Sequence, residues 1–152
     1  MTAVGVTVWT IGHSTHPIGR FIGLLAGFRI DRLADIRRYP TSRWPQFKAD
    51  ALEASLAAAG IDYAQIPELG GYRKGGYEEH VKTPEFADGI RTLVALAGEK
   101  TTAIMCAEAV FFRCHRRYVA EALVGAGHEV RHIYPDGRAH LHRPRGGLDP
   151  YS

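Results

Sequence analysis

The stretch 101–117, TTAIMCAEAVFFRCHRR, carries the strongest signal for the fold that we expect of this chain. It begins with a short apolar run that ends at Cys106, and its second half leads into a helical pattern. A short apolar run of this kind is typical of a buried strand in a parallel sheet, with the polar residues after it at the strand's carboxyl end. Ligands of open α/β sheets bind at that end. The stretch therefore predicts a fold class and the position of a site.

The same alternation of strand and helix extends to both sides of this stretch. Segments with the composition of strands are 7–11, 32–36, 61–66, 102–106 and 130–134. Segments with apolar residues at helical spacing lie between them, at 17–27, 48–59, 84–97 and about 114–127. This order predicts a three-layer Rossmann-like α/β sandwich, with a mainly parallel five-stranded sheet and helices on both faces. Short right-handed crossovers favour the strand order 3-2-1-4-5.

The composition is that of one soluble domain, with 45% hydrophobic and 23% charged residues among 152. No apolar run approaches the roughly 18 residues of a membrane span, and no basic region precedes the first apolar residues as in a signal peptide. We therefore expect a single α/β domain over residues 1–152, in the cytoplasm and not at a membrane, with 135–152 as a tail or surface arm. Two cysteines in a reducing compartment are expected to be free thiols.

Basic residues are grouped along the chain, although the net charge is only +3. The groups are Arg37, Arg38 and Arg43; Arg73 and Lys74; Arg113, Arg116 and Arg117; and Arg138, Arg143 and Arg145. If several groups converge in the fold, the ligand is anionic. The alternative is a set of separate, solvated surface charges.

The strand order determines which polar residues meet at the carboxyl edge of the sheet. If the first and fourth strands are neighbours, His13 and Ser14 lie against Cys106 and Glu108. The candidate ligand-binding residues are His13, Ser14, Asp35, Arg37, Arg43, Cys114 and Arg116. The candidate catalytic residues are Cys106, Glu108 and His115.

Four motifs in this order resemble the domain-of-unknown-function 488 family. They are TIGHS at 10–14, DIRRYPTSR at 35–43, ELGG at 68–71, and MCAE followed by CHR within 105–116. The resemblance covers nearly the whole chain. It implies a compact bacterial or archaeal α/β domain, and it implies no particular reaction.

Cys106 is the candidate nucleophile, because a thiol near a helix start and near arginines has a lowered pKa. The alternative is a packed, structural cysteine. Glu108 is either a general base or the ion-pair partner of an arginine. His115 and His13 are either acid–base groups or structural histidines.

Two other chemistries are disfavoured by spacing. The interval from Cys106 to Arg113 is one residue longer than the C-x5-R loop of cysteine phosphatases, and it lacks the glycines that cradle phosphate. Zinc is a minority hypothesis, because the cysteine spacing matches no common knuckle, and we assign no metal and no cofactor. The pair His140 and His142, with His132 nearby, is a weaker ligand signal than Cys106, Cys114 and His115, and the pair is expected to belong to a polar arm.

The functional hypothesis is an enzyme that acts on a nucleotide or a nucleic-acid-derived anionic ligand through a thiol at the sheet's carboxyl edge. The alternative is a non-catalytic nucleic-acid or nucleotide binding module with structural cysteines. Basic and aromatic residues in two loops, such as Arg43 with Trp44 and Arg73 with Tyr72, suit either ligand. The sequence leaves open whether the protein is an enzyme, which substrate it takes and whether it forms oligomers.

Overall fold

A computed structural model describes residues 5–13, 16–39, 42, 44–71, 75–106 and 116–143. Its strands are β1 (Thr7–Gly12), β2 (Arg32–Asp35), β3 (Asp62–Gln65), β4 (Thr102–Cys106), β5 (Glu129–Ile133) and β6 (Ala139–Leu141). Its α-helices are α1 (Ile18–Gly27), α2 (Ala49–Ala58), α3 (Tyr77–His80), α4 (Pro84–Glu99) and α5 (Arg116–Gly125). Two 3₁₀ turns are η1 (Pro45–Phe47) and η2 (Pro67–Leu69).

The described strands form one sheet in the order β3-β2-β4-β1-β5-β6. The pairs among β1 to β5 are parallel, and β6 pairs with β5 antiparallel. The α/β sandwich with a mainly parallel sheet is therefore confirmed. The predicted order 3-2-1-4-5 is wrong, because β4 lies between β2 and β1 and pairs with both.

The count of five strands is also wrong, because part of the expected tail forms the sixth strand. The backbone N–H of Tyr134 donates to the carbonyl of Arg138 at 2.8 Å, which closes the hairpin between β5 and β6. Gly137 in this turn has a φ of 88°, a conformation that glycine adopts without strain. A strand of three residues is too short to produce a recognisable alternation, so the sequence pattern missed it.

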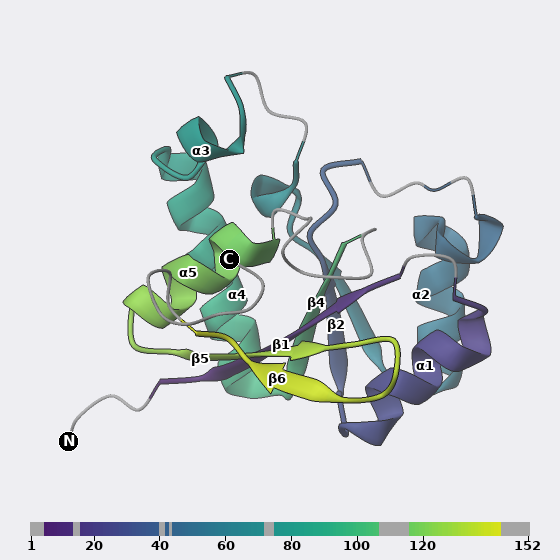
Figure 1. Cartoon of the computed structure of the whole chain (residues 1–152). Coiled ribbons are helices and arrows are strands. Elements are labelled where there is room, and N and C mark those ends of the chain that lie inside the picture. The colour runs from purple at the N-terminus through teal and green to yellow at the C-terminus, as the bar shows by residue number, and fades with distance from the viewer. Residues whose placement is uncertain are drawn as a thin grey trace.

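Helices cover both faces of the sheet, as Figure 1 shows with α4 and α5 on one side and α1 and α2 on the other. The residues buried on the first side include Ile104, Val119 and Leu123. The residues buried on the second side include Phe21, Leu52 and Met105. β4 contributes to both clusters and all five of its residues are buried, which explains its uninterrupted apolar sequence.

The ends of the helices follow local signals in the sequence. The Thr83 side chain accepts a hydrogen bond from the backbone N–H of Phe86 at 3.2 Å, and Pro84 occupies the first turn of α4. Gly60 follows α2 with a φ of 77°, as expected for a residue that ends a helix. Among the residues that the structure describes, no helix has the length and apolarity that crossing a membrane requires.

Candidate functional site

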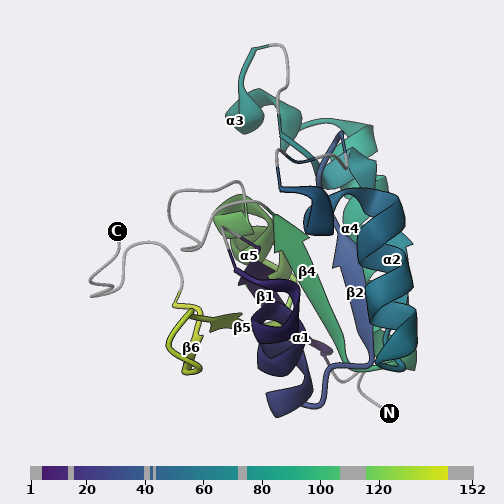
Figure 2. The same cartoon turned by 90° about the vertical axis from the view of Figure 1, so that its right-hand side faces the viewer.

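The connections that follow β1 and β4 leave the sheet on opposite faces. β1 continues into α1 on one face, and β4 is followed by α5 on the other (Figure 1). The two strands are neighbours, with Gly12 paired to Cys106 at their carboxyl ends. Neighbouring parallel strands with opposed connections define the point where an open α/β sheet binds ligands. Figure 2 shows the carboxyl ends of β2 and β4 side by side at this same edge.

His13 and Cys106 lie together at this point. The backbone N–H of His13 donates to the carbonyl of Cys106 at 2.9 Å, and both residues are buried. The imidazole of His13 stacks on the ring of Phe47, with 4.3 Å between the ring centroids. The structure thus brings these two predicted site residues into contact through their backbones and packs the His13 ring toward α1 and η1.

The sulfur of Cys106 is part of a disulfide, and Cys114 is the only other cysteine in the sequence. The structure therefore does not show the free thiol that the sequence predicted at Cys106. The reason for that prediction was the cellular compartment, which the fold does not determine. A thiolate is the nucleophilic form of cysteine, so reduction must precede any nucleophilic step at Cys106.

Asp35, the last residue of β2, and Arg37 form a buried ion pair. Arg37 Nε donates to Asp35 Oδ1 at 2.9 Å, and Nη2 donates to Oδ2 at 2.7 Å. Arg37 Nη1 also donates to the carbonyl of Phe47 at 2.7 Å. This paired geometry fixes both side chains, and it links the end of β2 to the turn that carries Phe47.

Tyr63 completes this cluster from β3. Its hydroxyl donates to Asp35 Oδ2 at 2.6 Å. Burial raises the pKa of the Tyr63 hydroxyl, and the hydrogen bond to the Asp35 carboxylate raises it further. The phenol therefore remains a neutral donor across the physiological range.

Arg116 is fully buried at the first turn of α5, on the face of the sheet that also carries Cys106. Its Nη1 donates to the hydroxyl of Thr10 on β1 at 3.1 Å. The Thr10 hydroxyl lies 2.6 Å from Nδ1 of His132 on β5, which is also buried. Arg116 is thus a cation beneath the carboxyl edge rather than at the molecular surface.

The hydrogen-bond chain continues from His132 to the surface. His132 Nε2 lies 2.9 Å from His142 Nδ1, and His142 Nε2 lies 3.0 Å from Glu121 Oε2. The expectation that His142 belongs to a polar arm is wrong, because its side chain is buried. His132 lies on β5, as the expected strand 130–134 implies, and it is buried as well. A signal was present for His132: it lies two residues after Val130, whose side chain is in the core, so the alternation of β5 turns both inward.

The remaining predicted site residues lie outside the described part of the chain. They are Ser14, Arg43, Glu108, Cys114 and His115. Among the described residues, no three side chains of His, Cys, Asp or Glu are grouped so that they could hold a metal ion.

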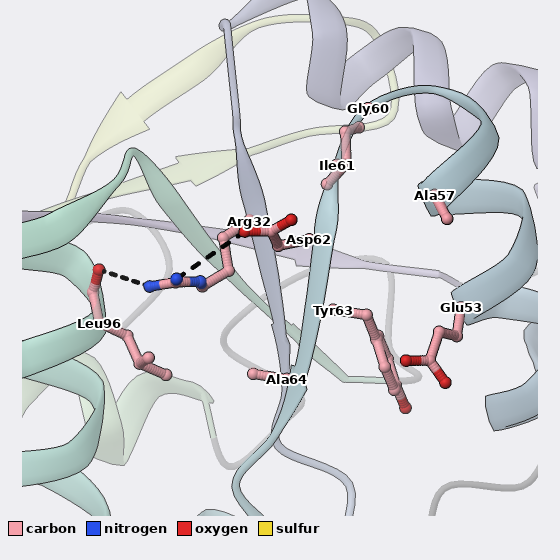
Figure 3. A pocket seen from close by; sticks show the side chains of 9 residues that line it. All are labelled: Arg32, Glu53, Ala57, Gly60, Ile61, Asp62, Tyr63, Ala64 and Leu96. Carbon is pink, nitrogen blue, oxygen red and sulfur yellow. Dashed lines mark hydrogen bonds and ion pairs between the residues drawn. The ribbon is translucent and has the colours of Figure 1, made fainter.

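A surface hollow of about 500 Å³ lies along β3, at the edge of the sheet (Figure 3). It is lined by Arg32, Glu53, Ala57, Gly60, Ile61, Asp62, Tyr63, Ala64 and Leu96. Arg32 Nη1 donates to the Leu96 carbonyl and to Glu99, each at 3.0 Å, so its guanidinium is held by groups of the protein itself. Arg32 and Asp62 begin their strands, so the hollow extends to the amino end of the sheet, opposite the switch point between β1 and β4.

The fold is that of an α/β protein with a mainly parallel sheet, and the candidate site lies at the switch point between β1 and β4. The family described as Domain of unknown function DUF488 matches residues 17–123, and the chain belongs to that family. The resemblance to that family is thereby confirmed, and three of the four motifs, those at 35–43, 68–71 and 105–116, lie within the matched residues. No curated protein and no solved structure matches the chain.

Proposed function

We propose that the protein is a cysteine-dependent enzyme that acts on a nucleotide or a nucleic-acid-derived anionic ligand at the carboxyl edge of its sheet. The observation that carries the proposal is the junction of β1 and β4, where opposed connections meet at Gly12 and Cys106. In this proposal reduced Cys106 is the nucleophile. Glu108 and His115, which follow it in the sequence, act as acid–base or orienting groups.

The anionic class of ligand is supported by buried positive charge on the Cys106 face of the sheet. Arg116 is held below this edge by the hydroxyl of Thr10, and Thr10 pairs with Ile104 across the β1–β4 ladder. Cys106 is two residues farther along β4 on the same face, which corresponds to about 7 Å of strand. A guanidinium held at Thr10, two positions before Cys106 along the β1–β4 ladder, would stabilise a thiolate at Cys106 and attract an anionic group.

The first experiment measures how fast iodoacetamide alkylates Cys106 as the pH is varied. The Cys114→Ser variant is used, because it leaves a single thiol and cannot form the disulfide within the chain. We expect the rate to reach its plateau below the ordinary thiol pKa of about 8.5. The same variant unfolded in guanidinium chloride is the control and titrates at the ordinary value. An inert or ordinary Cys106 in the folded protein contradicts the nucleophilic role.

The second experiment separates catalysis from binding. Nucleotides and short oligonucleotides are screened for turnover with the reduced protein, and Cys106→Ser is compared with the natural chain. Loss of turnover with retained ligand binding supports catalysis by the thiol. Turnover that survives the substitution contradicts it.

The alternative is a non-catalytic module that binds nucleic acid, and the observation that favours it is a pair of exposed aromatic rings. Tyr39 is 58% exposed and Trp44 is 39% exposed, on the segment that follows the Asp35–Arg37 pair. The guanidinium carbon of Arg38 lies 5.2 Å from the centroid of the Tyr39 ring. Exposed rings beside cations can stack on unpaired bases.

This alternative is tested by the binding of a fluorescent single-stranded oligonucleotide at increasing salt concentration. A nucleic-acid module loses affinity steeply with salt, and Tyr39→Ala with Trp44→Ala weakens binding at every salt concentration. Binding that is absent at low salt, or that ignores both substitutions, contradicts the alternative.

A further inference from the structure

Five side chains from α5, β1, β5 and the segment after β6 form one continuous hydrogen-bonded chain. They are Arg116, Thr10, His132, His142 and Glu121, joined at 3.1, 2.6, 2.9 and 3.0 Å. The chain begins and ends on α5 and passes through two strands of the sheet. The first four of these residues are buried, and Glu121 reaches the surface.

The two ends determine the direction of every bond in the chain. A guanidinium can only donate, and a carboxylate can only accept. With both histidines neutral, Thr10 accepts from Arg116 and donates to Nδ1 of His132. His132 then donates from Nε2 to Nδ1 of His142, and His142 donates from Nε2 to Glu121. Both histidines therefore carry their proton on Nε2, and each link has one donor and one acceptor.

The surroundings of His132 keep it neutral. Burial is the main cause that lowers the pKa of His132, to about 2, and repulsion from the protonated form of His142, from Arg116 and from the protonated form of His140 lowers it further. A neutral His132 has a free lone pair on Nδ1 only in the Nε2–H tautomer, so it can accept from Thr10. The Thr10 hydroxyl is then fixed in rotation, with its oxygen lone pairs toward Arg116.

We propose that Thr10, His132, His142 and Glu121 are positioning residues that hold the Arg116 guanidinium in the orientation that serves the anion-binding site beside Cys106. This inference rests on the proposed function, because it assigns Arg116 to the anionic part of the ligand. It extends the site by a segment of the chain, around β6, that the sequence pattern gave no role. These hydrogen bonds also explain why the buried Arg116 on α5 donates to β1 and is not directed to solvent.

The orientation of Arg116 is tested with two alkylating agents of the same reactivity class, one anionic and one neutral. Iodoacetate carries a carboxylate and iodoacetamide does not, so the ratio of their rates reports positive charge beside Cys106. The ratio is measured in the Cys114→Ser chain at low salt and at a pH above the end of the Cys106 titration. Two matched variants are compared, Thr10→Val, which removes the hydroxyl, and Thr10→Ser, which retains it.

We expect Thr10→Val to lower the iodoacetate-to-iodoacetamide ratio by about fivefold, and Thr10→Ser to leave it within about twofold of the parent. Circular dichroism and thermal unfolding establish that both variants are folded. An unchanged ratio in folded Thr10→Val overturns the proposal. The ratio requires only a thiolate, so a Cys106 with an ordinary pKa would overturn the proposed function and still leave this comparison valid.

The donor-to-acceptor direction of these hydrogen bonds is tested without any substitution. Long-range ¹H–¹⁵N spectra of the natural chain distinguish the two histidine tautomers. We expect His132 and His142 to carry their proton on Nε2 at neutral pH. A proton on Nδ1 of either histidine reverses a link in the chain and overturns the proposal, even if no variant folds.

Discussion

Buried polar side chains at single positions account for much of what is specific to this protein. Asp35 accepts from Arg37 and from Tyr63, and Arg37 in turn donates to the carbonyl of Phe47. Each group in this cluster has a partner in the fold. A buried charge that loses its partner is costly, which makes these residues sensitive tests of the structure.

We expect Asp35→Asn to lower the free energy of unfolding by about 3–5 kcal/mol, because it leaves the buried Arg37 without its carboxylate. The matched variant Tyr63→Phe removes one hydrogen bond to the same carboxylate and should cost about 1.5–3 kcal/mol. Urea unfolding at neutral pH measures both. Equal losses in the two variants would contradict the assignment of the Asp35–Arg37 pair as the main interaction.

The lowered pKa of the buried His132 leads us to expect that the stability of the fold depends on pH. Burial first, and then the charges of His142, Arg116 and His140, lower its pKa from about 6.5 to about 2 in the folded protein. Below pH 6.5 the unfolded chain binds a proton at this position that the folded chain does not bind. The free energy of unfolding is therefore unaffected by this group above pH 6.5. It decreases as the pH falls from 6.5 toward 2, by about 1.4 kcal/mol per pH unit, because protonation of His132 favours the unfolded chain.

The measurement is the free energy of unfolding at pH values below 6.5, for the natural chain and for His132→Gln. The variant lacks the titrating group, so its stability should fall less steeply, by about one proton's contribution. His140→Gln, at an exposed position on β6, is the control and should keep most of the steep fall, because burial is the main cause of the lowered pKa of His132 and the charge of His140 is the smallest. Parallel curves for the natural chain and His132→Gln would contradict the prediction.

The ELGG motif at 68–71 brings two elements together, because its Gly70 lies against the segment that follows β2. A Cβ at Gly70 would overlap the backbone nitrogen of Arg38 and lie 2.5 Å from its Cα. Backbone atoms cannot move aside as the end of a side chain can. The glycine therefore allows the segment after β3 to contact the segment after β2, which carries the Asp35–Arg37 pair.

We expect Gly70→Ala to destabilise the fold by about 1–3 kcal/mol, through overpacking against the Arg38 backbone. The control is Gly23→Ala, at an exposed position in α1 where a Cβ would contact nothing within 4 Å. That change should stabilise the protein by about 0.5–1 kcal/mol, because alanine is the better helix former. Thermal unfolding compares the two, and a neutral Gly70→Ala would contradict the close contact.

Across the molecule as a whole, we expect resistance to local opening to be greatest in the central strands β4 and β1. β4 is buried throughout and pairs with strands on both sides, while β3 and β6 lie at the edges of the described sheet. We expect the amide hydrogens of β4 to exchange only through global unfolding, and those of β6 to exchange by local opening. Hydrogen exchange resolved by residue tests this. Equal protection of the two strands would contradict it.

The family and the fold class were accessible from the sequence, because the signals for both are local. The apolar run of β4, the Thr83–Pro84 start of α4 and the four motifs are each read from a few consecutive residues. The Asp35–Arg37 pair is almost local as well, since its members are two residues apart, although their mutual hydrogen bonds were not foreseen.

Most of the helices and strands, their alternation and the position of Cys106 at a strand end could be predicted from the amino-acid sequence. The folded structure was needed to show that β4 lies between β2 and β1, that β6 joins the sheet, and that His132 and His142 are buried partners. The physical reason is that strand order depends on which faces of the sheet the crossover helices cover, and no single segment encodes that choice. The series of hydrogen bonds that connects Arg116 to Glu121 through Thr10, His132 and His142 depends on the register of β1 with β5 and of β5 with β6. That register exists only once those strands have paired.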